Sequence, residues 1–276
     1  MIFQKTKDIA ELKKVSHNIR NDILISLTEA GSGHTGGSLG LADVFSCLYF
    51  SVMNHDPQHT DWAERDRLIL SIGHVAPVLY ATLAHAGYFS VEELKTLRKL
   101  GSRLQGHPGR DHGLPGLELS AGSLGQGLSV AVGMALVAKM DKKDHFIYCI
   151  MGDGEQQEGS VWEAAMSAGH YKLENLVAVI DRNQLQIDGP NSQVMELEPL
   201  ADKWRAFGWN VSECNGNDHG ELLNYFDHCK NNKGKPNLII AHTLMGKGVK
   251  VIENDYRWHG KAPSKEQLTE FIGMLE

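Results

Sequence analysis

The stretch FIYCIMGDG at residues 146–154 decides the fold together with LVAVIDRN at residues 176–183. Each stretch opens with a short apolar run, as buried strands do, and closes with polar residues. Residues 155–172, which lie between the two, are predicted to form a helix. Because strand–helix–strand units almost always pair their strands in parallel, we predict an α/β fold with a parallel sheet and helices on both faces.

Asp153 and Asn183 follow these two strands directly, at the carboxyl ends where open α/β sheets bind ligands. Carboxylate, amide and backbone carbonyl oxygens are hard ligands that suit Mg²⁺ or Ca²⁺. Gly152 and Gly154 would let a phosphate approach the backbone, at the positive end of the following helix. The pattern predicts a site for a metal ion and a diphosphate. The alternative is a pair of polar turns that bind nothing.

Helical and strand-like periodicities extend along the chain. Predicted helices comprise residues 8–29, 39–53, 75–86 and 123–140, and further strands comprise residues 67–72, 209–214 and 238–242. A loop rich in glycine and serine is expected at residues 31–38, and Ser264 is expected to cap a final helix. No linker or repeat interrupts the pattern, so we expect one domain over residues 1–276.

Composition argues against several classes of function. The net charge of −7 disfavours nucleic-acid binding. No apolar run is long enough to span a bilayer, and the first twenty residues lack the apolar core of a signal peptide. The cysteines lie far apart without metal-type pairing, which suits a reducing compartment: Cys47, Cys149, Cys214 and Cys229. We therefore expect a cytoplasmic protein with no nucleic-acid or membrane partner.

Four of the fourteen histidines adjoin glycine or proline in predicted loops, where functional side chains concentrate: His34, His74, His107 and His259. Together they could form a cluster that handles protons or binds an oxyanion. A zinc site is the rival hypothesis, but no HExxH motif or paired Cys/His spacing supports it.

Two further features near the GDG segment have competing interpretations. Glu158 is either a carboxylate stabilised by the dipole at a helix start or a buried group at a subunit contact. GSLGQG, at residues 122–127, lacks the preceding strand that a dinucleotide-binding loop requires. Its backbone could still contact another ligand.

Several segments occur in a fixed order between about residues 30 and 263. They read SGHTGGSLGLAD, LILSIGH, GHPG, AGSLGQGLSVAVGMA, GDGEQQEGSVWEAAMSAGHYKLENLVAVIDRNQLQIDG and WHGKAP. In this order they resemble the thiamine-diphosphate-binding part of the transketolase family, over nearly the whole chain. The resemblance implies the thiamine-diphosphate-binding fold.

The resemblance also implies a role for individual residues. Asp153 and Asn183 would bind Mg²⁺ through their side chains, and Leu185 would bind it through its backbone carbonyl. Ca²⁺ or Mn²⁺ could take the place of Mg²⁺. Residues implied to contact thiamine diphosphate are His74, Gly122, Ser123, Leu124, Gly154, Glu158, Asn183 and His259. Residues implied to be catalytic, in the substrate channel, are His34, His107 and His259.

Two residues depart from the family pattern. Thr35 stands where the family commonly has proline, and Ile72 stands where a polar residue is usual. These departures affect the loop beside His34 and the surroundings of His74.

Transketolases continue into two further domains, the first of which supplies the glutamate that protonates the aminopyrimidine ring. This sequence ends at Glu276, just after the segment that resembles the first domain. The resemblance therefore implies the N-terminal subunit of a split transketolase, which would work only with a separate C-terminal subunit, with two copies of each chain. The implied enzyme is a transferase that moves a two-carbon ketol unit from a ketose or ketose phosphate to an aldose or aldose phosphate.

Two alternatives remain for the function. The chain could belong to another thiamine-diphosphate enzyme, such as a synthase or a 2-oxo acid dehydrogenase component. It could instead be a non-catalytic subunit that retains cofactor affinity.

Overall fold

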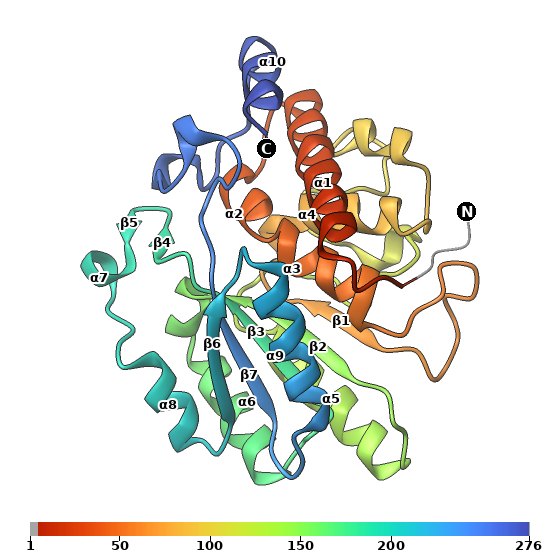
Figure 1. Ribbon diagram of the computed structural model, residues 1–276, viewed down its shortest axis with the longest axis vertical. Helices are drawn as coiled ribbons and strands as arrows, with labels where there is room; N and C mark the ends of the chain where they lie inside the picture. The colour runs from red at the N-terminus through yellow and green to blue at the C-terminus, as the bar shows by residue number, and fades with distance from the viewer. Residues whose placement is uncertain (1–4, 276) are drawn as a thin grey trace.

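A five-stranded parallel sheet forms the centre of the computed structural model, which describes residues 5–275 (Figure 1). Every neighbouring pair of strands is parallel. Gly152 lies opposite Asp181 in the register of the second and third strands, so these two strands end at the same level. The predicted strand–helix–strand unit is therefore confirmed. Across the sheet the strands follow the order β1 (Arg67–Leu70), β2 (Ile147–Gly152), β3 (Leu176–Asp181), β7 (Asn237–His242) and β6 (Asn210–Asn215).

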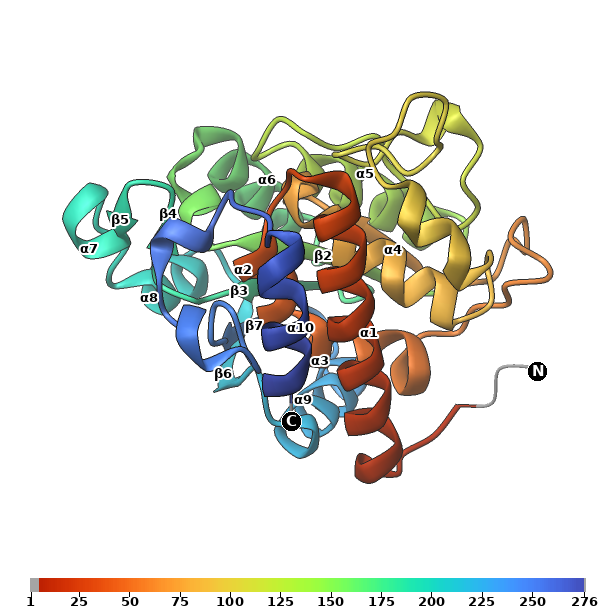
Figure 2. The same ribbon diagram turned by 90° about the horizontal axis from the view of Figure 1, so that it is seen from above.

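Helices cover both faces of this sheet (Figure 2). Within β2, Tyr148 and Ile150 pack into one core while Cys149 and Met151 pack into the other, because successive side chains of a strand alternate in direction. Because both faces are covered, β2 and β3 are apolar up to their last residues, Gly152 and Asp181, and the predicted α/β fold is confirmed. The first core includes α1 (Ile9–Ala30), α3 (Ala42–Cys47), α4 (Ala76–His85) and α9 (His219–Asn231), and the second includes α5 (Gly127–Met140), α6 (Gly159–His170) and α8 (Leu200–Ala206).

The first and last helices, α1 and α10 (Lys265–Met274), lie side by side at one end of the molecule (Figure 1). Asp8 caps α1 by accepting a hydrogen bond from the Ala10 N–H at 2.8 Å. Ser264 and Gln267 form a capping box at the start of α10, which confirms the expected cap. Within residues 5–275, no helix combines the length and the apolarity that crossing a bilayer requires.

The glycine-rich loop near the start of the chain is shorter than predicted. Helix α2 (Thr35–Gly40) begins at Thr35, whereas a loop was expected as far as residue 38. The predicted helix over residues 39–53 is divided, since a break at Leu41 precedes α3 and a π-helical turn (Leu48–Val52) follows it. Glycine disfavours helices, but a Cβ on Gly36 would lie 2.6 Å from Met245 Cγ. Close packing therefore overrides the propensity of this segment.

Three other elements start or end at different residues than predicted. The helix expected over residues 123–140 begins only at Gly127, because Gly125 adopts a φ of +79° and keeps the preceding segment in a loop. The helix expected over residues 155–172 opens with a 3-10 turn (Gly154–Gln157) before α6 begins. Strand β1 ends at Leu70 rather than at residue 72. The remaining elements near the strand ends are β4 (Leu185–Gln186), β5 (Gly189–Pro190) and α7 (Asn191–Val194).

Replacing a buried valine of the central sheet should measurably weaken the fold. Val179 in β3 is fully buried, so Val179→Ala removes about two buried carbons and leaves a cavity, which should cost about 2 kcal/mol of unfolding free energy. Val137→Ala makes the same change on α5 at a side chain that is 57% exposed, and it should cost less than about 0.5 kcal/mol. Urea unfolding measures both; equal losses would contradict the assignment of the core.

Candidate functional site

A cavity of about 400 Å³ opens at the carboxyl ends of β2 and β3. It brings together residues from widely separated segments of the chain. Ser123 is exposed and does not line the cavity. A larger cavity, of about 700 Å³, lies between α1 and residues 247–253 and contains none of the predicted site residues. The predicted site residues that line the smaller cavity are His34, His74, His107, Gly122, Leu124, Asp153, Gly154, Glu158, Asn183, Leu185 and His259.

Hydrogen bonds join the ends of β2 and β3 around Asp153, whose side chain is almost fully buried. The Asp153 N–H donates to the Asp181 carbonyl at 3.2 Å. One carboxylate oxygen of Asp153 accepts from the Gln184 N–H at 2.6 Å, which draws the turn of residues 183–185 against it. The Asp153 carboxylate, the Asn183 amide and the Leu185 carbonyl are therefore grouped at one edge of the sheet. Such a set of oxygens suits a hard cation.

Asp181, the last residue of β3, is a second buried carboxylate that the sequence analysis did not assign to the site. Its carboxylate accepts hydrogen bonds from the Thr243 hydroxyl and from Asn183 Nδ2, the latter at 3.0 Å. Burial raises the pKa of Asp181 to about 7, and the neighbouring charge of Asp153 acts in the same direction. Burial also raises the pKa of Asp153. Asp153 pairs with the buried Arg182 guanidinium at 3.1 Å, which offsets one of the two negative charges. A bound cation would stabilise the remaining desolvated carboxylate, so the residues fit a metal ion.

An acidic residue at the end of a wholly apolar strand is the signal that identifies Asp181 in the sequence. The sequence motif does not single out Asp181 as a site residue. Asn183, two residues later, already supplies the metal ligand that was expected after this strand.

The four loop histidines form one cluster. The ring centroid of His34 lies 5.0 Å from that of His74, 6.3 Å from that of His107 and 5.6 Å from that of His259. The rings of His74 and His259 are 5.2 Å apart. The structure thus brings together all four histidines that the sequence singled out, from segments that span more than two hundred residues of the chain.

Every ring in this cluster favours the neutral form. Burial lowers the pKa of His34 to about 4 and that of His74 to about 3, and the neighbouring histidines contribute further. Burial likewise lowers the pKa of His107 and of His259. A neutral imidazole offers one hydrogen-bond donor and one acceptor.

Within residues 5–275, two buried ring nitrogens of the cluster lack any hydrogen-bond partner. They are the buried Nδ1 atoms of His34 and His259, and both side chains line the cavity. A buried polar atom without a partner costs about 1–3 kcal/mol, so a polar ligand or water in this cavity would be stabilised. The cavity therefore fits a polar cofactor as well as a metal ion.

Glu155 organises the backbone around the cavity, a role that the sequence analysis did not foresee. Its buried carboxylate accepts hydrogen bonds from the Ser71 hydroxyl and from the Gly125 N–H, the latter at 2.7 Å. The other oxygen accepts from the Gly152 N–H at 3.1 Å. Ser71 Oγ in turn accepts from the Gly127 N–H at 3.1 Å. One carboxylate thus ties the ends of β1 and β2 to the GSLGQG loop.

Glu158 stands immediately before α6 in an extended conformation, at the rim of the cavity. It makes no side-chain capping hydrogen bond, and its side chain is exposed. Stabilisation by the helix dipole requires no such bond, so both interpretations of Glu158 stay predictions. A Cβ on Gly125 would lie 2.7 Å from Glu158 Cβ, so the GSLGQG loop packs directly against this residue.

The two departures from the family pattern have structural consequences. The buried hydroxyl of Thr35 donates to the Lys261 carbonyl at 2.6 Å, a bond that proline could not make. This bond ties the segment of His34 to the loop of His259. Ile72 is buried and packs within 3.1 Å of the position that a Cβ on Gly152 would occupy.

The zinc hypothesis gains no support from the described part of the chain. Among residues 5–275, no group of three or more His, Cys, Asp or Glu side chains could hold a metal ion together. The candidate cation site described above uses an amide and a backbone carbonyl instead, which is a ligand set for a hard cation and not for zinc.

Comparison with known proteins identifies the family of this architecture. Residues 12–272 match the family model described as "Transketolase, thiamine diphosphate binding domain". The chain is 44% identical to an apulose-4-phosphate transketolase subunit of Phocaeicola vulgatus, over 96% of this chain and 93% of that one. It is 43% identical to the 6-deoxy-6-sulfo-D-fructose transketolase subunit SqwG of a Clostridium species, over 96% of each chain.

Longer relatives match over only part of their length. The transketolase structure from Leishmania mexicana superposes with a TM-score of 0.89 at 33% identity, covering 98% of this chain and 42% of that one. Human transketolase is 38% identical over 95% of this chain and 41% of its own length. The chain therefore spans about two fifths of these longer relatives and nearly all of the two shorter ones.

Glu155→Gln should loosen the backbone around the cavity. A glutamine keeps the shape but places an N–H₂ group against a backbone N–H donor, so one buried donor loses its acceptor. We expect a loss of about 1–3 kcal/mol in unfolding free energy, measured by urea denaturation. Glu163→Gln makes the same change on the exposed side of α6 and should have no measurable effect. An unaltered stability in Glu155→Gln would refute the organising role.

The buried histidines His34 and His74 should make the fold less stable as the pH falls, whereas the raised pKa of Asp181 acts in the opposite direction. As pH drops below 6.5, the unfolded chain binds protons that the folded His34 and His74 do not, since folding depresses their pKa values to about 4 and about 3. The stability that these neutral rings confer is thus complete above pH 6.5 and is lost progressively as pH falls toward 3.

His74→Asn removes one of these groups and should flatten the dependence of the urea midpoint on pH between about 7 and 5. His228→Asn, at an exposed residue of α9, is the matched control and should leave the slope unchanged. Equal slopes in the two variants would argue against a buried neutral His74.

Proposed function

This chain belongs to the transketolase family, and we propose that it forms the thiamine-diphosphate-binding subunit of a two-chain transketolase. The proposed reaction transfers a two-carbon ketol unit from a ketose, phosphorylated or not, to an aldose or aldose phosphate. The observation that carries the proposal is the cavity in which a desolvated carboxylate site adjoins four neutral histidines.

In the proposed enzyme, the strand-end oxygens hold the metal ion and the diphosphate lies beside them. Asp153, Asn183 and the Leu185 carbonyl bind Mg²⁺, while Gly154 and His74 contact the diphosphate. The backbone at Gly122 and Leu124 faces the aminopyrimidine ring. When bound, thiamine diphosphate supplies the nucleophilic carbon and the electron sink for cleaving and forming the carbon–carbon bond.

The remaining histidines would bind the sugar. Because burial keeps His34 and His259 neutral, each ring can donate one hydrogen bond and accept another. His107 and His259 position the donor hydroxyls and the carbonyl oxygen, and His34 contributes to binding the acceptor. A neutral ring can also accept a proton as a general base.

A separate partner chain would complete the enzyme. This proposal is supported by the two relatives that are named as subunits and that match this chain over nearly their whole length. We further propose two copies of each chain and a cytoplasmic location. All four cysteines are buried and unpaired, which is consistent with a reducing compartment.

The test is a ketol-transfer assay with thiamine diphosphate and Mg²⁺, run on this chain alone, on the candidate partner alone and on their mixture. We expect activity in the mixture only. Ketose donors to compare are xylulose 5-phosphate and the two sugars in the names of the relatives, apulose 4-phosphate and 6-deoxy-6-sulfofructose. Full activity of this chain alone would overturn the two-chain proposal.

A variant distinguishes the metal role from a general loss of structure. Asp153→Asn should weaken Mg²⁺-dependent binding of thiamine diphosphate by at least roughly 10–100-fold, the loss that removing even an outer-shell partner of a metal ligand causes. Asp144→Asn, at an exposed position, should bind normally. Calorimetry of the mixture measures both affinities, and an unchanged affinity in Asp153→Asn would sink the assignment of the metal site.

A further inference from the structure

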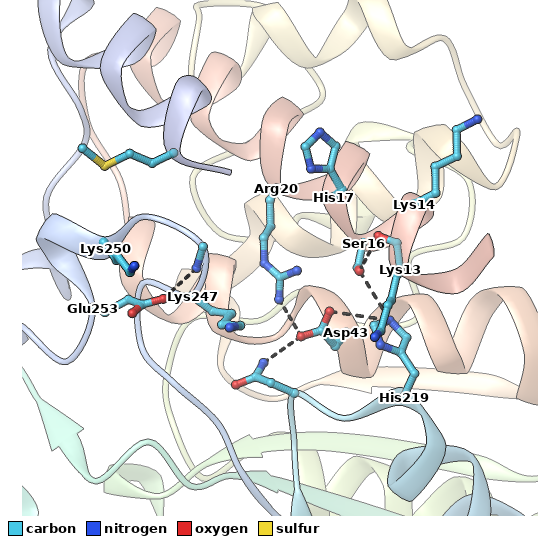
Figure 3. A pocket seen from close by; sticks show the side chains of 13 residues that line it. Lys13, Lys14, Ser16, His17, Arg20, Asp43, His219, Lys247, Lys250 and Glu253 are labelled. Atoms are coloured by element: carbon cyan, nitrogen blue, oxygen red, sulfur yellow. Dashed lines mark hydrogen bonds and ion pairs between the residues drawn. The ribbon is translucent and has the colours of Figure 1, made fainter. Parts of the chain in front are cut away.

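The larger cavity, of about 700 Å³, lies between α1 and the segment of residues 247–253 (Figure 3). It shares no lining residue with the cavity at the strand ends. Two lysines from α1 and two from the other segment line it: Lys13, Lys14, Lys247 and Lys250. Within residues 5–275, none of the four ammonium groups forms a hydrogen bond or an ion pair.

The cavity also contains a buried arginine that is held in a fixed position. Arg20 is 6% exposed; its Nε donates to the Leu39 carbonyl at 3.1 Å and its Nη2 donates to Asp43 at 2.6 Å. Asn217 Nδ2 donates to the same Asp43 oxygen at 2.8 Å, and the buried His219 ring lies 3.6 Å from the other oxygen. These contacts fix the guanidinium against the cavity (Figure 3).

Positive charge exceeds negative charge around this cavity. Four lysines and Arg20 line the cavity together with two carboxylates, Asp43 and Glu253. Asp43 is already paired with Arg20, and Glu253 accepts from the Gly248 N–H at 3.0 Å. The surplus amounts to +3 with the histidines counted as neutral, in a chain whose net charge is −7. Such a local reversal of sign attracts anions into a concave surface.

A further feature of the cavity is an unsatisfied polar atom. His219 is 3% exposed, lines the cavity, and has an Nδ1 atom with no hydrogen-bond partner within residues 5–275. Burial lowers the pKa of His219, so the ring adds hydrogen-bonding capacity rather than charge.

We propose that this cavity binds a small anion carrying two phosphate groups. Lysines on two opposing segments would each bind one end of such a ligand, whereas a single phosphate would leave one pair unneutralised. The volume of about 700 Å³ also exceeds the needs of one phosphate and is typical of a small-molecule site. A nucleic acid is disfavoured because the chain as a whole would repel a long polyanion.

The probe for the test is inorganic pyrophosphate, titrated calorimetrically into the full chain in magnesium-free buffer at low ionic strength. We expect saturable binding that weakens as salt is added, because the lysines are partly exposed. The double variant Lys13→Gln/Lys250→Gln, which removes one charge from each wall, should bind roughly tenfold or more weakly. Urea unfolding verifies that each variant is folded.

Two controls locate the binding. Lys235→Gln/Lys265→Gln makes the same change in net charge at exposed lysines outside the cavity and should bind as the unmodified chain does. His74→Asn alters the strand-end cavity, so a loss of binding confined to this variant would place the pyrophosphate in that cavity. Equal affinity in the Lys13/Lys250 variant and its lysine control, a loss seen only in His74→Asn, or no binding to the unmodified chain would each overturn the proposal.

Discussion

The matched ends of β2 and β3 are the constraint on which the candidate site depends. Because Gly152 pairs with Asp181, the next residues of both strands leave the sheet at one level. The Asp153 N–H then bonds to the Asp181 carbonyl, and the Asp153 carboxylate accepts from the Gln184 N–H. A register shift of one residue would reverse the direction of every side chain and separate these oxygens. The proposed metal ligands are therefore a consequence of strand pairing and not of their own attraction.

Burial then sets the charge state of this cavity. It raises the pKa of Asp153 and Asp181 and lowers the pKa of His34 and His74, so in each case the neutral form gains. Acidic groups in such surroundings favour a nearby cation, while neutral imidazoles suit hydrogen bonds to hydroxyl and carbonyl groups. The second cavity differs because its lysines are partly exposed and remain solvated. One site is thus prepared by desolvation, and the other attracts ligands by accumulated charge.

Hydrogen bonds from buried side chains to the backbone hold the loops around the strand-end cavity together. Glu155 holds the GSLGQG loop to the ends of β1 and β2 through two backbone N–H groups and the Ser71 hydroxyl. Thr35 similarly bonds the start of α2 to the loop that carries His259. Both residues act on the cavity through the backbone, and both are buried. A few specific hydrogen bonds therefore help to hold the loops that line the cavity.

The sequence by itself determined the sheet, its covered faces and most residues of the candidate site. Short apolar runs that end in polar residues identify buried parallel strands, and residues next to glycine identify the four loop histidines. Only the tertiary structure decided where α2 begins, that Asp181 lies in the site, and that Glu155 supports three segments. The physical reason is distance along the chain: Gly36 is helical because it packs on Met245, and Glu155 matters because Ser71 and Gly125 fold against it. Local patterns carry no information about partners so far away.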